Sequence, residues 1–139
     1  MTAIRYQRLA PERLPLANKF YKGQRSPMRV GRSEQVWVAQ RADILAACCL
    51  KPVADGHWLT ALLVAREQRR QGIAAQLLGE LRAHTQGPIW LFCAPELVDF
   101  YRRLGFLPCH DLPAELTERL RRYQQKQPLL ALAADAQQA

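Results

Sequence analysis

The stretch Leu59–Leu81 reads LTALLVAREQRRQGIAAQLLGEL. It begins with an apolar run, Leu59–Val64, which is typical of a strand buried on both faces. A basic turn follows at Arg66–Gln71, and Gly72 then opens a segment with apolar residues at helical spacing. Those apolar residues are Ile73, Leu77, Leu78 and Leu81. The stretch therefore predicts a strand, a basic turn and a helix, in that order.

The turn before this helix has the properties of a phosphate site. A helix start leaves about four backbone N–H groups unpaired and carries roughly half a positive charge. Gly72 has no Cβ, so a phosphate could lie directly against the backbone. Arg66, Arg69 and Arg70 add attraction, although exposed charges are screened by salt. The alternative is an ordinary turn between a strand and a helix, with a solvated arginine cluster.

Two motifs carry a resemblance to a known family. Arg69–Ala74 (RRQGIA) resembles the R/Q-x-x-G-x-G/A signature of the GNAT superfamily of acyl-CoA-dependent N-acetyltransferases. About 30 residues later, Asp99–Phe106 (DFYRRLGF) resembles the FYxxLGF segment of that family. Either motif alone is weak, but the two in this order, on both sides of an expected strand, are more specific. The resemblance extends over roughly Val36–Leu107.

The resemblance implies an α/β fold of the GNAT type. Such a fold has a mixed, mostly antiparallel sheet with a central parallel βαβ splay and helices on both faces. A chain of 139 residues is expected to form a single domain, here 1–139. The implied activity is transfer of the acetyl group of acetyl-CoA to a primary amine, by direct attack of that amine on the thioester.

By resemblance, the acetyl-CoA cosubstrate would bind along the opening stretch. Its pyrophosphate would face the amides of about residues 70–75, and its pantetheine arm would pair with the edge of the strand Leu59–Val64. The residues expected to bind it are Leu62, Val64, Arg69, Arg70, Gln71, Gly72, Ile73 and Ala74. Leu62 and Val64 would contribute their backbone groups.

Tyr101 is the first candidate catalytic residue. In the family, the tyrosine at this position is a proposed acid for the departing CoA thiolate. A phenol has a pKa near 10 and a thiol one near 8.5, so full proton transfer would be uphill by about 2 kcal/mol. A hydrogen bond that stabilises the thiolate is therefore the safer role. The alternative is a helix tyrosine that only packs at the edge of the core.

His57 is the candidate general base, because an imidazole titrates near neutral pH. The expected central strand carries no carboxylate, and Glu34, Asp55 and Glu96 are weaker candidates. His57 can also be a histidine at a strand entrance with no catalytic part, and an amine that is already neutral needs no base. Cys93 ends the strand expected to line the acetyl site, but no histidine near it in sequence would activate it as a nucleophile.

Composition limits the partners. The net charge is +8, and residues 1–32 hold eight basic residues against Glu12 alone, which gives +7. This segment is either a solvated surface or one wall of an acceptor cleft, and a basic wall predicts a neutral or acidic acceptor. We expect a small-molecule or peptide amine as acceptor, with an aminoacylated RNA among the candidates. A non-catalytic module that binds CoA or nucleic acid is the competing hypothesis, but no helix-turn-helix or zinc finger supports it.

The four cysteines favour no metal site. Cys48, Cys49, Cys93 and Cys109 form no C-x-x-C pair, so we expect core residues and no bound metal. No apolar stretch reaches the roughly 20 residues of a membrane span, and the N-terminus has no apolar signal core. A cytoplasmic protein that does not insert into membranes is the expectation. Strand edges near the C-terminus would allow a homodimer.

The remaining elements follow from periodicity and turn signals. Strands are expected at Ala3–Leu9 (an edge strand), Gln35–Gln40, Ile44–Leu50, His57–Val64, Ile89–Cys93, Phe106–Cys109 and Leu129–Ala133. Helices are expected at Pro11–Tyr21, Gly72–Thr85, Pro95–Leu104 and Asp111–Lys126, a basic loop at Lys22–Ser33, and a turn at Lys51–Gly56. The second and third strands should form a hairpin, and His57–Val64 and Ile89–Cys93 should be parallel. The helix at Asp111–Lys126 stands where the family usually has a direct strand pair, and the end from Ala134 onward should fray.

Overall fold

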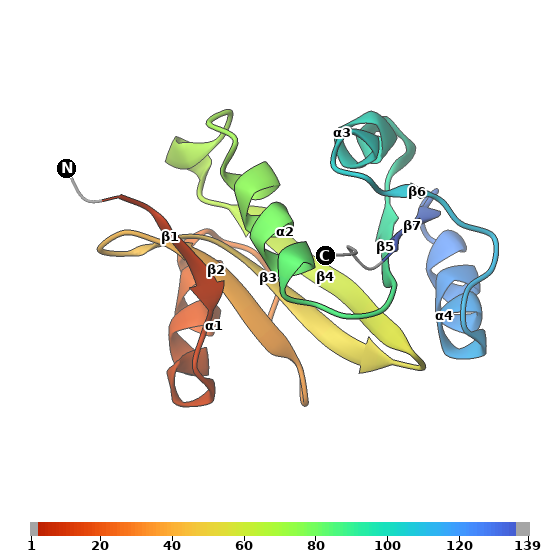
Figure 1. Ribbon diagram of the computed structural model, residues 1–139, viewed down its shortest axis with the longest axis horizontal. Coiled ribbons are helices and arrows are strands. Elements are labelled where there is room, and N and C mark those ends of the chain that lie inside the picture. The colour runs from red at the N-terminus through yellow and green to blue at the C-terminus, as the bar shows by residue number, and fades with distance from the viewer. Residues whose placement is uncertain (1–2, 136–139) are drawn as a thin grey trace. The chain divides into compact units, whose positions relative to one another are not determined.

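The computed structural model describes residues 3–135, which contain seven strands in one sheet and four α-helices (Figure 1). The strands are β1 (Arg5–Arg8), β2 (Gln35–Gln40), β3 (Ile44–Val53), β4 (Gly56–Val64), β5 (Ile89–Cys93), β6 (Leu107–Pro108) and β7 (Leu130–Ala134). The α-helices are α1 (Leu14–Gly23), α2 (Ile73–Ala83), α3 (Val98–Arg103) and α4 (Ala114–Gln124).

The sheet is mixed and mostly antiparallel. Hydrogen bonds join its strands in the order β1-β2-β3-β4-β5-β7-β6. The β4–β5 pair is parallel and is joined through His57↔Ile89 and Trp58↔Trp90, whereas β1–β2, β2–β3, β5–β7 and β6–β7 are antiparallel. These pairings confirm the expected fold class, the hairpin of β2 and β3, and the parallel strands on either side of α2.

The chain divides into two compact units, each with its own core. Unit 1 comprises residues 1–51 and 59–85, and unit 2 comprises residues 52–58 and 86–139. The long strand β4 contributes its first three residues to unit 2 and its remainder to unit 1. That the two units act as a single domain stays a prediction.

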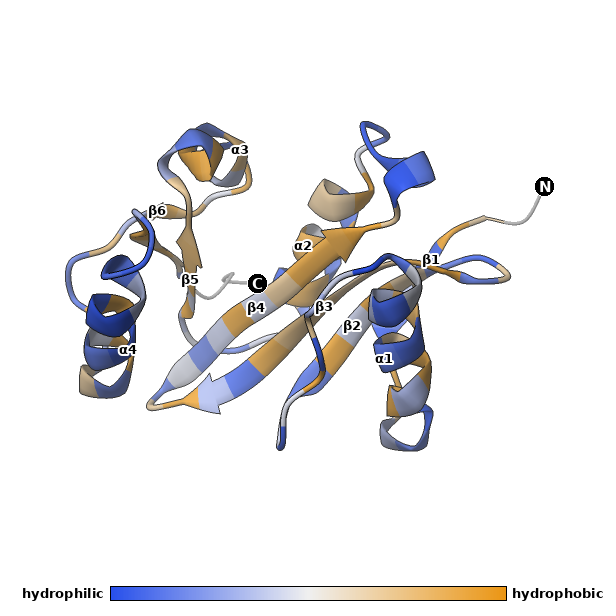
Figure 2. Ribbon diagram, turned by 180° about the vertical axis from the view of Figure 1, so that it is seen from behind, coloured by the Kyte–Doolittle hydropathy of each residue, from blue (hydrophilic) through white to orange (hydrophobic). Residues whose placement is uncertain are grey.

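In unit 1 the sheet has a helix on each face. Alternation along β2 explains this, because Val36 and Val38 point to one side and Trp37 to the other. The first side forms a core with Ala17 and Tyr21 of α1. On the second side α2 lies against β1 and β2 (Figures 1 and 2). There the centre of the Trp37 ring is 5.9 Å from that of the His84 ring.

In unit 2 a smaller core forms around two tryptophans. Trp58 and Trp90 pack with Val53 and with Leu116, the one fully buried residue of α4. The guanidinium carbon of Arg119, one turn along α4, lies 4.8 Å from the centre of the Trp58 ring, an arrangement that favours a cation–π contact. Figure 2 shows most of α4 as hydrophilic, which agrees with its narrow apolar stripe. The three tryptophans are buried, as expected.

Prolines explain most of the shifted helix starts. The helix expected at Pro11–Tyr21 begins as a 3-10 turn at Pro11–Arg13, and α1 starts only at Leu14, with Pro15 in its first turn. The segment Pro95–Leu104 likewise begins as a 3-10 turn at Pro95–Leu97 before α3. In the last helix the expectation of a start at Asp111 was wrong, because Pro113 keeps an extended conformation (φ −55°, ψ 150°) and α4 begins at Ala114.

Two predictions about the sheet were wrong. The turn expected at Lys51–Gly56 is only two residues long, because β3 continues to Val53, which is buried against α4, and Ala54 turns with φ +50°. The run Leu59–Val64 is not buried on both faces, since only Leu59 is buried and the residues after it are half-buried. Figure 2 shows most of this half-buried part of β4 as hydrophobic.

The C-terminal part keeps the expected order with shorter elements. The strand expected at Phe106–Cys109 is reduced to β6, which pairs with β7 although α4 lies between them in the sequence. Ala134, expected to fray, is the last residue of β7, and residues 136–139 of that expectation lie outside the described residues. Among the residues that the structure describes, no helix has the length and apolar character needed to cross a bilayer.

Candidate functional site

The loop between β4 and α2 has an exposed backbone with two left-handed residues. A 3-10 turn at Arg66–Gln68 leaves β4, and Arg70 (φ +65°) and Gly72 (φ +76°) then reverse the chain. Nothing lies within 4 Å of the place where a Cβ would stand on Gly72. The glycine is therefore required by its backbone angle, and the space beside it is open to a ligand.

The first turn of α2 presents unpaired amides next to this glycine. Gly72 is the N-cap residue, and the amide of Gln76 makes the first helical hydrogen bond, to the Gly72 carbonyl at 3.0 Å. The amides of Ile73 and Ala74 precede that bond, so the helix offers them no carbonyl. Within the described residues no side chain caps this end. The arrangement is suited to an anion such as a phosphate.

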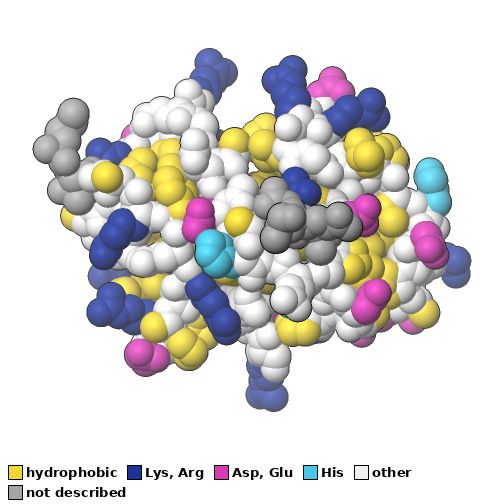
Figure 3. Space-filling view, viewed as in Figure 1, with side chains coloured by type: hydrophobic (Ala, Val, Ile, Leu, Met, Phe, Trp, Pro, Cys, Tyr) yellow, Lys and Arg dark blue, Asp and Glu magenta, His cyan; other side chains and the backbone are white. Residues whose placement is uncertain are grey.

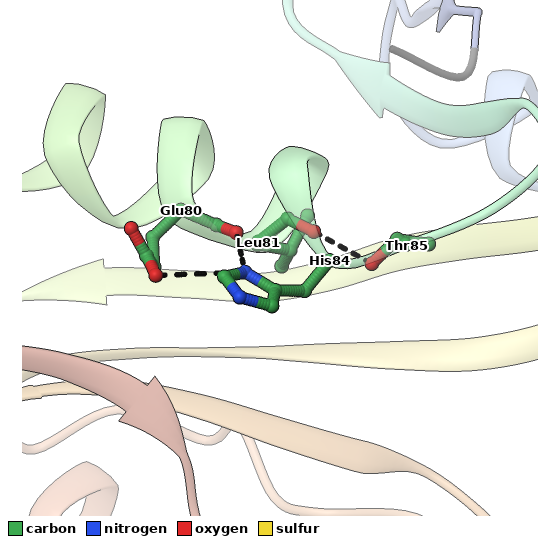
Figure 4. Close-up of polar contacts among 4 residues, drawn as sticks. All are labelled: Glu80, Leu81, His84 and Thr85. Atoms are coloured by element: carbon green, nitrogen blue, oxygen red, sulfur yellow. Dashed lines mark hydrogen bonds and ion pairs between the residues drawn. The ribbon is translucent and has the colours of Figure 1, made fainter. Parts of the chain in front are cut away.

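Burial of one face of α2 fixes the direction of this helix start. The four apolar residues predicted to face the core, Ile73, Leu77, Leu78 and Leu81, are all buried. At the other end His84 and Thr85 finish the helix (Figure 4). The Thr85 hydroxyl donates to the Leu81 carbonyl at 2.7 Å, and Nδ1 of His84 lies 3.0 Å from the Glu80 carbonyl and 3.5 Å from its carboxylate. These contacts all lie within residues 80–85, so they cap the C-terminal end of α2.

One side chain and one backbone carbonyl tie the loop to the rest of unit 1. The Arg66 amide donates to Oε1 of Gln24 at 3.0 Å, and the Ala65 amide donates to the Leu45 carbonyl at 2.8 Å. Arg69 is exposed, and its Nε donates to the Val64 carbonyl at 3.1 Å. Arg69 therefore already contacts the end of β4, while Arg70 and Gln71 are exposed. Gln24 was not singled out by the sequence, because a glutamine in a basic loop gives no signal.

Tyr101 lies on α3 in unit 2 and is half-buried. Its ring is 5.0 Å from Phe100 and 6.0 Å from Phe106, each in an edge-to-face arrangement. Phe106 is fully buried, and its amide donates to the Tyr101 carbonyl at 3.0 Å. Gly105 has φ +94° and so allows this helix end, as expected for a glycine after the last helical turn. The motif Asp99–Phe106 therefore consists of most of α3, the left-handed Gly105 and the fully buried Phe106.

His57 is half-buried at the start of β4, in unit 2. Its amide donates to the Pro88 carbonyl at 2.9 Å, next to the first pair of the parallel ladder. Burial lowers the pKa of its imidazole, so the ring is neutral at pH 7. Among the described residues, Nδ1 of His57 is buried and has no hydrogen-bond partner. A neutral imidazole has one ring nitrogen without a proton, so His57 has the chemistry of a proton acceptor.

The cysteines are free thiols in or near the cores. Cys48, Cys49 and Cys93 are buried, and Cys109 is half-buried. Burial raises the pKa of Cys93, and nearby Glu96 raises it further, so the group is a neutral thiol and a poor nucleophile near pH 7. Over residues 3–135, no group of three or more His, Cys, Asp or Glu side chains is arranged to hold a metal ion.

Basic side chains do not merge into one area on the face drawn in Figure 3. Lys and Arg occur there singly or in small groups, with other surface between them. Within the basic N-terminal segment, the loop after α1 is held by a hydrogen bond from the Val30 amide to Asn18 Oδ1 at 2.9 Å. Gly23, Gln24 and Arg25 line a surface pocket together with Arg66 and Glu67, beside the start of the loop that leads to α2.

The sequence missed one buried contact in unit 1. Ala61, in the middle of β4, has φ +58°, and its carbonyl accepts a hydrogen bond from the Tyr21 hydroxyl at 2.7 Å. Neither residue stands out in the sequence, because an alanine inside an apolar run does not indicate a positive φ and a tyrosine on an amphipathic helix usually only packs.

Comparison with known proteins gives consistent results. The family model described as acetyltransferase (GNAT) domain matches residues 32–108. No curated protein sequence matches the chain. Among solved structures, a GNAT-family acetyltransferase from Staphylococcus aureus Mu50 superimposes with a TM-score of 0.64 at 15% identity, over 97% of this chain and 100% of that one.

Two further structures have the same fold. The ribosomal-protein-S18-alanine N-acetyltransferase from Escherichia coli has a TM-score of 0.66 and 16% identity, over 99% of this chain and 96% of that one. The N-acetylglutamate synthase from Neisseria gonorrhoeae, complexed with coenzyme A and N-acetyl-glutamate, has a TM-score of 0.70 and 13% identity. That match covers 99% of this chain and 36% of the synthase. Since the family model spans more than half of the sequence, the chain belongs to the GNAT acetyltransferase family.

Proposed function

We propose that this protein transfers the acetyl group of acetyl-CoA to a primary amine. The amine nitrogen attacks the thioester carbonyl, the C–S bond breaks, CoA leaves as a thiolate, and the nitrogen loses a proton. The observation that carries the proposal is the exposed, left-handed Gly72 at the start of α2, beside amides that lack helical partners. We propose that the pyrophosphate of acetyl-CoA binds there, against the backbone of residues 70–75.

The energetics of this loop require further contacts. A hydrogen bond to a charged group contributes about 1.5–3 kcal/mol net. Association itself costs at least about 4 kcal/mol, and micromolar affinity requires about −8 kcal/mol. Four amides alone would therefore bind weakly. We propose that the backbones of Leu62 and Val64 bind the pantetheine arm, and that Arg69 and Arg70 attract the phosphates.

Arg69 limits how Val64 can take part in this binding. The Val64 carbonyl already accepts a hydrogen bond from Nε of Arg69. A carbonyl oxygen has two lone pairs, so it can accept a second bond. We propose that Arg69 holds the end of β4 through Nε, while its other guanidinium N–H groups join Arg70 and Gln71 in facing the phosphates.

Tyr101 and His57 are proposed to serve the chemical step. A hydrogen bond from the Tyr101 hydroxyl would stabilise the leaving thiolate, for which an outright proton transfer is unfavourable. His57 would accept the proton that the amine loses, because burial lowers the pKa of its imidazole and so favours the neutral form that can take up a proton.

The acceptor is proposed to be an amine of an amino acid or a peptide N-terminus. Two structures with this fold are named for such chemistry, one for the alanine of a ribosomal protein and the other for N-acetylglutamate. An α-amine, with a pKa near 8, loses a proton at neutral pH far more readily than a lysine side chain. Acidic and neutral acceptors should be favoured by the net charge of +8.

Calorimetric titration with acetyl-CoA tests the proposal, with CoA and ATP as comparisons. We expect micromolar binding of acetyl-CoA and CoA, and at least tenfold weaker binding in Gly72→Val. The reasons are that a β-branched residue resists φ +76° and that its side chain would fill the space left for the phosphate. Binding should be followed by a screen of amino acids and short peptides for release of free CoA thiol.

The matched control is Gly79→Ala, an exposed glycine in the middle of the same helix, which should bind acetyl-CoA like the natural protein. No binding at millimolar acetyl-CoA would refute the proposed function. Salt-sensitive RNA binding in its place would support a nucleic-acid-binding module. Binding of acetyl-CoA without turnover on any amine would indicate a CoA-binding module.

A further inference from the structure

One residue in β4 departs from strand geometry. Ala61 has φ +58°, in the left-handed region, although the residues around it are extended. For a residue with a Cβ this conformation is disfavoured by a factor of about 5–30 relative to ordinary backbone. A carbonyl turned by such a residue leaves the sheet ladder and needs another donor. The structure must therefore contain something that holds Ala61 in place.

The Tyr21 side chain supplies that donor. Its hydroxyl donates to the Ala61 carbonyl at 2.7 Å and lies 3.8 Å from Sγ of Cys49. Tyr21 is completely buried on α1, in the core that Ala61 and Leu63 join from β4. Burial raises the pKa of Tyr21, and the thiols of Cys49 and Cys48 raise it further, so the hydroxyl stays a neutral donor.

The position of Ala61 connects this contact to cosubstrate binding. Ala61 directly precedes Leu62, and Val64 follows two residues later. A left-handed residue changes the direction of the amides and carbonyls that come after it in a strand. The orientation of the Leu62 backbone therefore depends on the conformation of Ala61.

We propose that Tyr21 is a positioning residue, whose hydrogen bond holds Ala61 in the left-handed conformation and so orients the Leu62 backbone for acetyl-CoA. The inference rests on the proposed function, because it assigns the pantetheine arm to this part of β4. Tyr21 would not touch acetyl-CoA itself. It would act through the backbone of β4, from the helix that packs beneath it.

Removal of the hydroxyl tests the proposal. We expect Tyr21→Phe to weaken acetyl-CoA binding about 5- to 30-fold, and to raise the KM for acetyl-CoA with little change in the KM for the amine. Glycine adopts positive φ freely. Addition of Ala61→Gly to Tyr21→Phe should therefore restore the affinity to within about threefold of the natural protein.

The control variants separate positioning from a general loss of packing. Tyr6→Phe removes a tyrosine hydroxyl from β1 in the same unit and should leave acetyl-CoA binding unchanged. Ala61→Val keeps the Tyr21 hydroxyl but disfavours positive φ, so it should weaken binding as Tyr21→Phe does. If Tyr21→Phe alone does not fold, the acetyl-CoA affinity of Ala61→Val still tests the proposal. Natural affinity in Ala61→Val, or no rescue of Tyr21→Phe by Ala61→Gly, would overturn the proposal.

Urea unfolding distinguishes failure of this inference from failure of the proposed function. A natural protein that binds no acetyl-CoA refutes the function, whatever Tyr21 does. In that case the contact is still tested by the urea midpoints of Tyr21→Phe, of Ala61→Gly and of the variant that carries both substitutions. Non-additive shifts would support the hold of Tyr21 on Ala61, and additive shifts would overturn it.

Discussion

The backbone carbonyl and the ring of Tyr101 both contact residues of unit 2. The Tyr101 carbonyl accepts hydrogen bonds from the amides of Leu104 and Phe106 at 2.9 and 3.0 Å, and its ring contacts that of Phe106. A change confined to the hydroxyl therefore leaves these contacts in place. This makes Tyr101 a residue whose chemistry can be tested apart from its packing.

We expect Tyr101→Phe to lower kcat by about 10- to 100-fold, because the leaving thiolate loses a hydrogen-bond donor. Affinity for acetyl-CoA should change little, since the proposed contact strengthens only as the thiolate forms. Steady-state kinetics with the best amine from the screen measures both quantities. Unchanged turnover would mean that Tyr101 only packs against Phe106.

His57 gives a prediction about pH. Because burial lowers the pKa of its imidazole below the ordinary 6.5, the base form dominates above that pH. The value of kcat/KM should therefore rise with pH through a pKa below about 6.5, and this dependence should be lost in His57→Gln, with a fall of at least about 100-fold. His84→Gln, at an exposed histidine of α2, is the control. The same pH profile in His57→Gln and in the natural protein would exclude His57 as the base.

For single residues, the sequence identified the glycine of a motif but not the residues whose roles come from contacts with distant parts of the chain. Gly72 could be predicted because glycine is the usual residue at a left-handed helix start beside a phosphate. Ala61 could not, because only the surrounding β4 and the buried Tyr21 require its positive φ. Gln24 contacts the Arg66 amide across 42 residues of sequence, and no local pattern indicates such a contact. The assignments of Gly72, Tyr101 and His57 to function stay predictions.

Among the secondary-structure elements, two glycines differ in the space around them. Gly56 begins β4, where an added Cβ would meet the Pro88 carbonyl oxygen and stand 2.9 Å from the Trp90 ring. Gly79 lies in the middle of α2, with nothing within 4 Å of an added Cβ. The first glycine allows two backbones to approach each other closely, and the second has no packing role.

We therefore expect Gly56→Ala to lower the free energy of unfolding by about 1–3 kcal/mol, because the strand start must move away from Pro88. Gly79→Ala should raise it by about 0.5–1 kcal/mol, because alanine is the better helix former. Urea denaturation of both variants measures these changes. Equal stability of the two variants would contradict the close approach at Gly56.

The sequence predicted the order and type of most elements, but burial decided their ends. The β-branched and aromatic residues of QVWVAQ placed β2 at its observed bounds, Gln35–Gln40. In β3 the expected end at Leu50 was three residues short, because Val53 is buried against α4, a segment more than 60 residues later in the chain. The sequence likewise did not predict that β4 is only half-buried after Leu59, because an apolar run does not indicate whether another element packs against each of its faces.

For the whole molecule, buried thiols that stay protonated make the stability depend on pH. Cys48 and Cys49 are fully buried side by side in sequence on β3, and Tyr21 packs in the same core as Cys49. Burial raises the pKa of Cys48, with a further contribution from Cys49. Burial and the nearby Glu34 carboxylate raise the pKa of Cys49 to about 12, although the hydrogen bond with Tyr21 opposes this.

These thiols should make the folded protein sensitive to alkaline pH. An unfolded thiol loses its proton near pH 8.5, whereas the folded ones keep theirs, so above that pH the unfolded state binds fewer protons and stability falls. Between about pH 9 and 11 the free energy of unfolding should drop by up to about 1.4 kcal/mol per pH unit for each thiol. Urea denaturation under reducing conditions measures the slope. Cys49→Ala should reduce the slope of the free energy of unfolding against pH by the contribution of one proton, whatever its effect on stability at pH 7. A free energy of unfolding that stays constant from pH 8.5 to 10.5 would show that the buried thiols do not resist ionisation.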